Sequence, residues 1–331
     1  MLRFPKTTTA VVATVGALLL SGCGTTETTP SASADRLDRQ GQSVTVTDSR
    51  GKEVTLDEPA TRVVGLEWGE VEMFATLGVS PVGVADPEGY ATWDAAAPLD
   101  DSVQDVGGRG EPSVDSIVAL RPDLVVMEAD RGTALIRQIE KYVPVIVTTG
   151  SDASRNLERM REDFTMIAKA VGKTDEAEQI LEDFDARLAD GREQIAAAGA
   201  TGHKFAMADG WREGGNVNMR MFGQGALFSD VAEELGLENA WTGKVDSTWG
   251  LGTTDVEGVT ALKDDEDLQF FYSASEDPDV FADGLAGNAI WESLPFVEQG
   301  NLHKLDEGTW TFGGPAACEK LIDQVLEVYA A

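Results

Sequence analysis

The sequence is poor in cysteine and histidine, the residues from which most protein metal sites and redox motifs are built. Its 331 residues include two cysteines, Cys23 and Cys318, and two histidines, His203 and His303. Neither cysteine belongs to a CxxC pair, and the histidines lie far apart in the chain. These spacings exclude a disulfide scaffold and a metal cage built mainly from imidazoles, so we expect no intrinsic cofactor and no protein-ligated metal.

Positive charge is scarce as well. The chain carries 26 Lys and Arg against 58 Asp and Glu, a formal net charge of -32. Such a chain repels phosphate backbones and anionic lipid surfaces, so we expect no nucleic-acid partner. Hydrophobic residues make up 42% of the sequence, which is enough to build a substantial core. The length predicts two domains of about 100 to 200 residues each.

The first 22 residues have the layout of a secretory signal. Arg3 and Lys6 precede an apolar stretch, residues 10–20, that is shorter than the about 20 residues needed to span a bilayer. The motif LSGC at 20–23 resembles the lipobox of bacterial lipoproteins, which implies cleavage before Cys23 and acylation of that cysteine. The alternative is an ordinary signal peptide with an incidental cysteine. We therefore expect an extracytoplasmic protein, lipid-anchored at Cys23 to the bacterial cytoplasmic membrane.

The segment 23–42 follows as a flexible tether, because it is rich in Thr, Ser and small residues that cannot pack. Alternating residues around the turn formers at 48–51 then predict a β-hairpin. From residue 62 onward, apolar strands alternate with segments of helical periodicity. This pattern predicts an α/β lobe over 43–151 with a largely parallel sheet. The apolar strands are RVVGL, PVGVA, DLVVM and PVIVT.

One uninterrupted helix is predicted at the division of the chain. Residues 153–171 place apolar side chains at helical intervals, and no Gly or Pro occurs before Gly172. We therefore expect a connecting helix at 152–172 and a C-terminal α/β lobe at 173–331. The latter begins with a second helix at about 175–198.

An internal repeat relates the two lobes. Residues 113–121 correspond to residues 255–263 with three identities, and each copy begins with a helix N-cap residue and has an acid in the first turn. Two lobes of similar design leave a cleft outside the carboxyl ends of their strands, which is the predicted ligand site.

Five runs of the sequence carry a family resemblance: 62–86, 106–126, 221–241, 247–264 and 308–315, including VGGRGEP and STWGLGTT. They resemble the substrate-binding lipoproteins of ABC importers for ferric siderophores, and within that family the ferrichrome and iron-dicitrate branch. The resemblance covers nearly all of 43–331. It implies two similar α/β lobes of the class III periplasmic-binding-protein type, joined by one long α-helix. It also implies a monomer that performs no reaction and hands a ferric chelate to membrane permease subunits.

Arg109, in the loop VGGRGEP, matches a family arginine that contacts the iron-bound oxygens of the ligand. A guanidinium suits this role because it offers several fixed donors and keeps its charge. The alternative is a surface arginine paired with Glu111 or Asp105. Arg131 follows the strand DLVVM, where some relatives have an aromatic residue. The added charge favours a more anionic chelate, such as a carboxylate type.

Trp249 matches a family tryptophan that packs against the ligand, and a core tryptophan is the alternative. Trp68, Tyr90 and Trp310 are further aromatic candidates on segments expected at the cleft, each equally compatible with packing. Two more arginines, Arg220 and Arg212, either add charge to the pocket or face solvent.

Asp115 and Glu257 occupy equivalent positions of the repeat. Acids in a first helical turn stabilise the helix, which is one reading of both residues. The resemblance implies a second, compatible role, in which one acid on each lobe docks into an arginine pocket of a permease subunit.

Two other classes of function remain open. A haem or cobalamin binding lipoprotein would share the architecture, and haem would want an axial His or Tyr, whereas His303 lies in a strand-like run. A secreted carboxylate-based hydrolase would need two paired acids, but no pair stands out. No GxSxG or GxxxxGK[ST] motif is present, and Cys318 fits a buried helix position. Hydroxamate, catecholate and citrate siderophores all remain possible ligands.

Overall fold

The computed structural model describes residues 43–214, 216–274 and 278–330. All of them belong to one compact unit, Arg39–Ala331. The predicted signal peptide, the tether and the acylated Cys23 lie outside the described residues. Within the described part, no helix is both long enough and apolar enough to cross a membrane.

The N-terminal lobe is built on a five-stranded parallel sheet of strand order β5-β4-β3-β8-β9. The four apolar strands predicted from the sequence are all present, and β8 and β9 are buried along their whole length, as expected for a sheet covered on both faces. The strands are β3 (Val63–Gly65), β4 (Gly83–Val84), β5 (Gln104–Asp105), β8 (Leu124–Glu128) and β9 (Val145–Thr148). The helices of the lobe are α2 (Trp68–Thr76), α3 (Pro87–Trp93), α4 (Val114–Ala119) and α5 (Thr133–Ile139), with a short 3-10 turn η1 (Ala129–Arg131).

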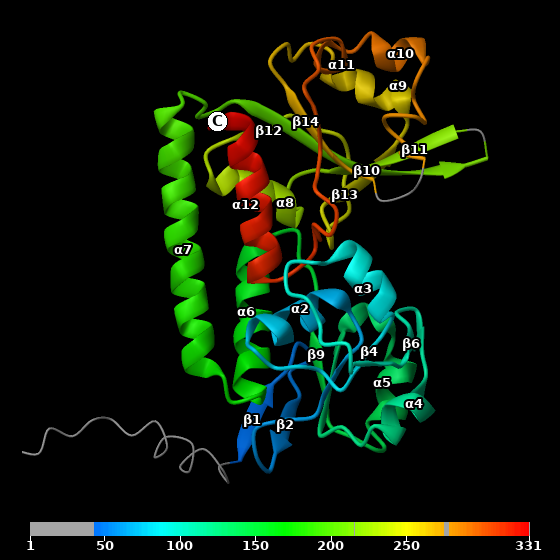
Figure 1. Cartoon of the computed structure of the whole chain (residues 1–331), viewed down its shortest axis with the longest axis vertical. Helices are drawn as coiled ribbons and strands as arrows, with labels where there is room; N and C mark the ends of the chain where they lie inside the picture. Colours follow the sequence, from blue (N-terminus) through cyan, green and yellow to red (C-terminus); the bar gives the residue numbers. More distant parts are fainter. Residues whose placement is uncertain (1–42, 215, 275–277, 331) are drawn as a thin grey trace, which may run out of the picture. The chain divides into compact units, whose positions relative to one another are not determined.

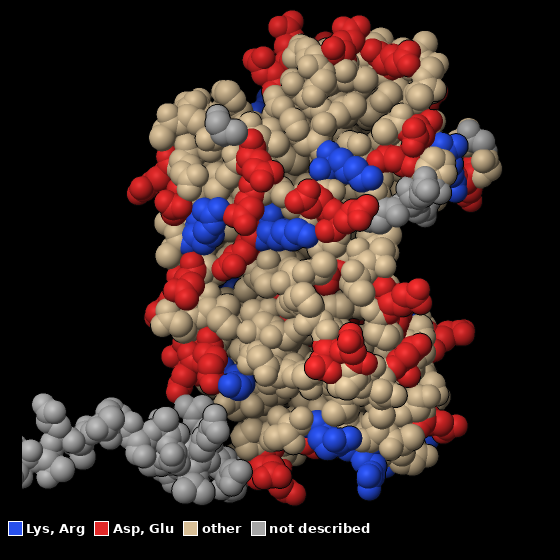
Figure 2. Space-filling model, viewed as in Figure 1, with Lys and Arg blue, Asp and Glu red and all other residues tan. Residues whose placement is uncertain are grey.

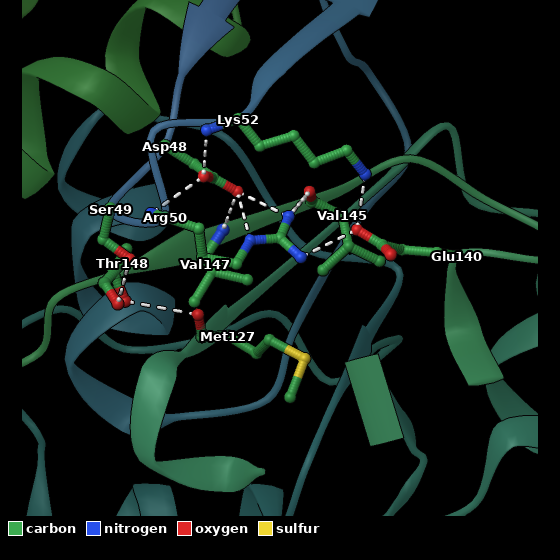
Figure 3. A network of polar contacts seen from close by, with 9 residues as sticks. All are labelled: Asp48, Ser49, Arg50, Lys52, Met127, Glu140, Val145, Val147 and Thr148. Atoms are coloured by element: carbon green, nitrogen blue, oxygen red, sulfur yellow. Dashed lines mark hydrogen bonds and ion pairs between the residues drawn. The ribbon is translucent and has the colours of Figure 1, made fainter. Parts of the chain in front are cut away.

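The predicted hairpin, β1 (Val44–Thr47) and β2 (Glu53–Leu56), is confirmed, and its turn is tied to the edge strand β9. Figure 3 shows the contacts. The buried Asp48 carboxylate accepts hydrogen bonds from the Arg50 side chain and from the Val147 backbone N–H. Arg50 and Lys52 both pair with Glu140, at 2.8 and 2.6 Å. These bonds hold the hairpin against β9 and cover that edge of the sheet.

The C-terminal lobe contains a mixed sheet of order β13-β11-β10-β14-β15, with β12 also paired to β10. Its strands are β10 (Lys204–Glu213), β11 (Asn216–Phe222), β12 (Glu238–Asn239), β13 (Leu251–Thr254), β14 (Gln269–Ser273) and β15 (Leu302–Lys304). Its shorter helices are α8 (Leu227–Glu234), α9 (Val256–Val259), α10 (Ala289–Glu292) and α11 (Pro295–Glu298). The two lobes are therefore not identical in topology, because the long β10–β11 hairpin and β13 add antiparallel pairs to this sheet.

The long helix α7 (Thr174–Ala197) runs alongside two others in Figure 1, α6 (Asn156–Ala170) and α12 (Pro315–Tyr329). The helix α6, within the predicted connecting segment, packs against β1 and α2 of the first lobe and against α8 and α12 of the second. One apolar core therefore runs through both lobes, with Phe74, Phe164, Phe228 and the predicted buried thiol Cys318 all fully buried in it. The structure therefore confirms the predicted fold of two α/β lobes joined by a long helix.

The repeat predicted from the sequence forms the same local structure twice. Ser113 caps α4 by accepting from the N–H of Ser116, and Asp255 caps α9 by accepting from the N–H of Gly258. Each helix then leads toward a central strand of its sheet, β8 or β14. The acids of the pair, Asp115 and Glu257, are exposed at the second position of each helix.

Candidate ligand-binding cleft

Two adjoining cavities, of about 450 and 330 Å³, are lined by residues of both lobes. They share the side chains of Arg109, Arg220, Trp310 and Phe312, so we treat them as one cleft. The N-terminal lobe contributes Glu67, Trp68, Trp93, Arg109, Glu128, Asp130 and Arg131. The C-terminal lobe contributes most notably Asp209, Trp211, Arg220, Trp249, Trp310 and Phe312.

A buried carboxylate organises the N-terminal side of the cleft. Glu67 follows β3 and is the N-cap of α2, where its Oε1 accepts from the N–H of Trp68 at 3.0 Å. Its side chain is 4% exposed. Arg109 pairs with it through Nη2 at 2.6 Å and Nε at 3.1 Å, and Arg131 forms a second ion pair with its Oε2. Two guanidinium groups are therefore held by one acid.

Arg109 stands at the tip of a two-residue turn between β6 (Gly107–Gly108) and β7 (Glu111–Pro112). Gly107 on β6 has a φ of 103°, which side chains rarely tolerate, and a Cβ there would lie 3.1 Å from the backbone oxygen of Glu111 on β7. The guanidinium carbon of Arg109 lies 3.9 Å from the ring centroid of Trp68 and 5.3 Å from that of Trp310. The Trp68 indole N–H donates to the backbone oxygens of Ala85 and Asp86, which fixes the ring under Arg109.

On the C-terminal side, Arg220 of β11 binds the carboxylate of Asp209 on β10 with two guanidinium nitrogens. The two residues face each other in the antiparallel register. Phe312 lies 5.5 Å from the Arg220 guanidinium and packs edge-on against Trp249 and Trp310, with centroids 5.4 and 5.2 Å away. The cleft is thus lined by guanidinium groups and aromatic faces from both lobes.

The loop that carries Trp249 is held from two sides. The Asp246 carboxylate accepts from the backbone N–H groups of Thr248 and Trp249. The Thr248 carbonyl in turn accepts from the hydroxyl of Ser151 in the other lobe, at 2.8 Å. These bonds position Trp249 at the boundary between the lobes.

Burial shifts the pKa of several charged groups in the cleft. It lowers the pKa of Arg109 and Arg131, although guanidinium groups remain protonated at any physiological pH. It raises the pKa of Glu128 well above its usual range, and that of Asp209 despite the bond to Arg220.

The family of the chain follows from comparison with known proteins. Residues 63–309 match the family model described as periplasmic binding protein. The chain belongs to the periplasmic binding protein family. Members of this family bind solutes rather than catalyse reactions, which confirms the prediction that the protein is not an enzyme.

We describe the similarity of the chain to three of these proteins. The chain is 29% identical over 252 residues to the iron(3+)-hydroxamate-binding protein FhuD of Escherichia coli K12, covering 76% of this chain and 81% of that one. It is 26% identical over 320 residues to the Fe(3+)-citrate-binding protein YfmC of Bacillus subtilis 168, covering 94% and 92%. The Fe3+-Desferal-bound siderophore binding protein FhuD of Vibrio cholerae has the same fold, with a TM-score of 0.71 at 24% identity over 82% and 98%.

The structure of this binding protein brings six of the predicted ligand-binding residues to the cleft: Trp68, Arg109, Arg131, Arg220, Trp249 and Trp310. It does not bring Tyr90 there. Tyr90 belongs to α3 and is 1% exposed. It is buried in a cluster with Trp68, Val71 and Val84, and donates its hydroxyl hydrogen to the Ala97 carbonyl. Arg212 is exposed on β10 and does not line the cleft.

Several cleft residues were missed in the sequence. Glu67, not Glu111 or Asp105, is the partner of Arg109, and the contact spans 42 residues. No residue pattern within VGGRGEP predicts that Arg109 pairs with Glu67. Asp209 could have been found, because a hairpin turning near Gly214 places Asp209 opposite Arg220. Trp93, Trp211 and Phe312 also line the cleft, but no sequence motif around them distinguishes a residue that lines a cavity from one in the core.

Among the described residues of this binding protein, no group of three or more His, Cys, Asp or Glu side chains is placed to hold a metal ion. His303 lies on β15, where its Nε2 is 2.7 Å from the Gln269 amide oxygen and burial lowers its pKa. It does not line the cleft and therefore does not offer an axial ligand there.

Proposed function

We propose that this protein captures a ferric siderophore in the cleft and delivers it to the permease of an ABC importer for iron uptake. The observation that carries the proposal is the set of guanidinium groups and indole faces that both lobes present to one cavity. The names of the relatives, which bind ferric hydroxamate, ferric citrate and ferric Desferal, support the same class of ligand.

The chemistry of the cleft suits a wrapped metal. In a ferric siderophore the chelator supplies the hard oxygen ligands, so the protein contacts only the outside of the complex. Arg109 and Arg220 can donate to iron-bound oxygens, which carry partial negative charge. Trp249, Trp310 and Phe312 offer apolar surface to the organic scaffold. Haem is less well suited, because no His or Tyr side chain lies among the described residues that line the two cavities.

The proposal extends to location and partners. A lipid anchor at Cys23 and the tether at 23–42 would hold a monomer at the outer face of the cytoplasmic membrane. Asp115 and Glu257 would dock into the two permease subunits, one acid from each lobe. Their exposure at equivalent helix positions supports this role. Figure 2 shows Asp and Glu side chains spread over the visible face of both lobes.

Ligand class is tested by titration of the purified protein with ferric desferrioxamine, ferric citrate, haem and cobalamin, with tryptophan emission as the signal. Trp68, Trp249 and Trp310 line the cleft, so a bound chelate quenches them. We expect saturation near one equivalent for at least one ferric chelate. Saturation by haem or cobalamin alone would overturn the proposal.

Docking is tested separately by the double variant Asp115→Ala with Glu257→Ala. We expect chelate binding to remain intact and uptake of radioactive iron by cells to be lost. The matched control is Glu58→Ala with Glu266→Ala, which removes one exposed acid from each lobe and leaves uptake unchanged. Uptake that persists in the first variant contradicts the docking assignment.

A further inference from the structure

We propose that Glu67 sets the charge class of the chelate. By binding both Arg109 and Arg131, it leaves the cleft close to neutral, so that the protein selects ferric chelates of low net charge, such as hydroxamates, over multiply anionic ones, such as citrate complexes. The inference rests on the proposed function and adds a specificity-determining residue to it.

The position of Glu67 makes it a fixed part of the cleft. Its backbone lies at the junction of β3 and α2. Its carboxylate accepts hydrogen bonds from the N–H of Trp68 and from Arg109, and it forms an ion pair with Arg131. All three partners are donors, two of them cationic, and the carboxylate lies at the positive end of a helix, where negative charge is favoured. At 4% exposure the carboxylate is shielded from solvent, although it forms part of the cavity wall.

The remaining charges of the cleft are also compensated. Arg220 is bound by Asp209, and the Nε of Arg131 lies 3.4 Å from Asp130. Three guanidinium groups therefore face three carboxylates. Glu128, a fourth acid on the cavity wall, is buried, and its ionisation would make the cleft net negative.

This balance decides which chelate fits. From the sequence, we predicted that the positive charge of Arg131 favours an anionic chelate. In the structure Arg131 forms an ion pair with Glu67, so its charge is no longer free to attract an anionic ligand. A multiply anionic chelate would bring its charge close to Glu67 and Asp209 in a partly desolvated cavity, where like charges repel strongly. A neutral or weakly cationic chelate instead presents iron-bound oxygens to guanidinium N–H groups and apolar surface to the aromatic rings.

The test measures dissociation constants by fluorescence quenching for ferric desferrioxamine, which is weakly cationic, neutral ferrichrome and anionic ferric citrate. For the wild-type protein we expect at least tenfold tighter binding of one of the two low-charge chelates than of ferric citrate. Glu67→Gln keeps the shape of the side chain and removes its charge, so we expect the preference to shift toward ferric citrate by tenfold or more. The control Glu111→Gln makes the same change in net charge on β7 and leaves the preference unchanged.

The outcomes separate the two proposals. If no ferric chelate binds the wild-type protein, the proposed function itself fails. If ferric citrate binds the wild-type protein as tightly as the low-charge chelates, only the inference on Glu67 fails. Asp209→Asn is the second variant, and it should shift the preference in the same direction even if Glu67→Gln does not fold. An unchanged preference in the variants that fold would overturn the role of the buried acids.

Discussion

Replacing Arg109 by alanine removes the guanidinium that the structure holds between two indole rings and a buried acid. Its carbon is 3.9 Å from the Trp68 ring centroid, and its Nη2 is 2.6 Å from Glu67. In the chelate complex the same group is expected to donate to iron-bound oxygens. The variant therefore loses a charged contact and part of the aromatic stack at once.

The expected loss of binding free energy depends on how far the contact is shielded from water. Truncating one partner of a desolvated charged contact costs about 2 to 5 kcal/mol of binding free energy. The lower end applies here, because the Arg109 side chain is 26% exposed and Arg131 still pairs with Glu67. About 2 kcal/mol corresponds to roughly 30-fold weaker binding, since about 1.4 kcal/mol is tenfold. The dissociation constant of Arg109→Lys should lie between those of the wild type and Arg109→Ala, because lysine keeps the positive charge but lacks the planar guanidinium group.

The assay is the fluorescence titration with whichever ferric chelate binds the wild-type protein most tightly. Arg137→Ala on α5 serves as the control, because it removes an exposed arginine outside the cleft and should leave the dissociation constant unchanged. Circular dichroism should show that both variants are folded. A dissociation constant for Arg109→Ala within threefold of wild type would refute the assignment of this residue to the site.

Two further predictions concern stability. Glu72 is fully buried on α2 and accepts from the backbone N–H groups of Gly314 and Ala316 at the start of α12, so Glu72→Ala should lower the unfolding free energy at pH 6 by about 2 kcal/mol. Urea denaturation measures this, and a loss no larger than that of the exposed control Glu88→Ala would contradict it. Burial also raises the pKa of Glu70 and Glu72 to about 7 from the usual 4.5. The folded state therefore keeps protons that the unfolded chain releases between these values, and stability should fall as pH rises from about 5 to 7, by up to about 1.4 kcal/mol per unit for each group. A flat or rising profile over that range would rule out the buried protonated acids.

Local patterns predicted most of the fold. The parallel strands stand out because a sheet covered on both faces needs continuous apolar runs, and β8 and β9 are such runs. The repeat predicted the equivalent helices α4 and α9, because N-cap chemistry at Ser113 and Asp255 is a local property. The different topology of the second sheet was not predictable in the same way, since strand pairing depends on contacts between distant segments.

The cleft was only partly predictable for the same reason. The family resemblance pointed to Arg109 and Trp249, but the partner of an arginine is set by the fold, and Glu67 reaches Arg109 from a different strand. Tyr90 is the one predicted ligand-binding residue that the structure does not bring to the cleft. It lies on the short helix α3, and its sequence gives no periodicity that would show which face is buried. An aromatic residue near a predicted cleft can equally be part of the wall behind it.

The central claim is that both lobes grip one ferric chelate without ligating its iron. A crystal structure of the protein with its best-binding ferric chelate, with the iron located by anomalous scattering, tests this directly. The account predicts a single iron peak in the cleft between Arg109 and Arg220, coordinated by chelator oxygens alone. An iron atom bound by protein carboxylates, or a peak outside the cleft, would contradict it.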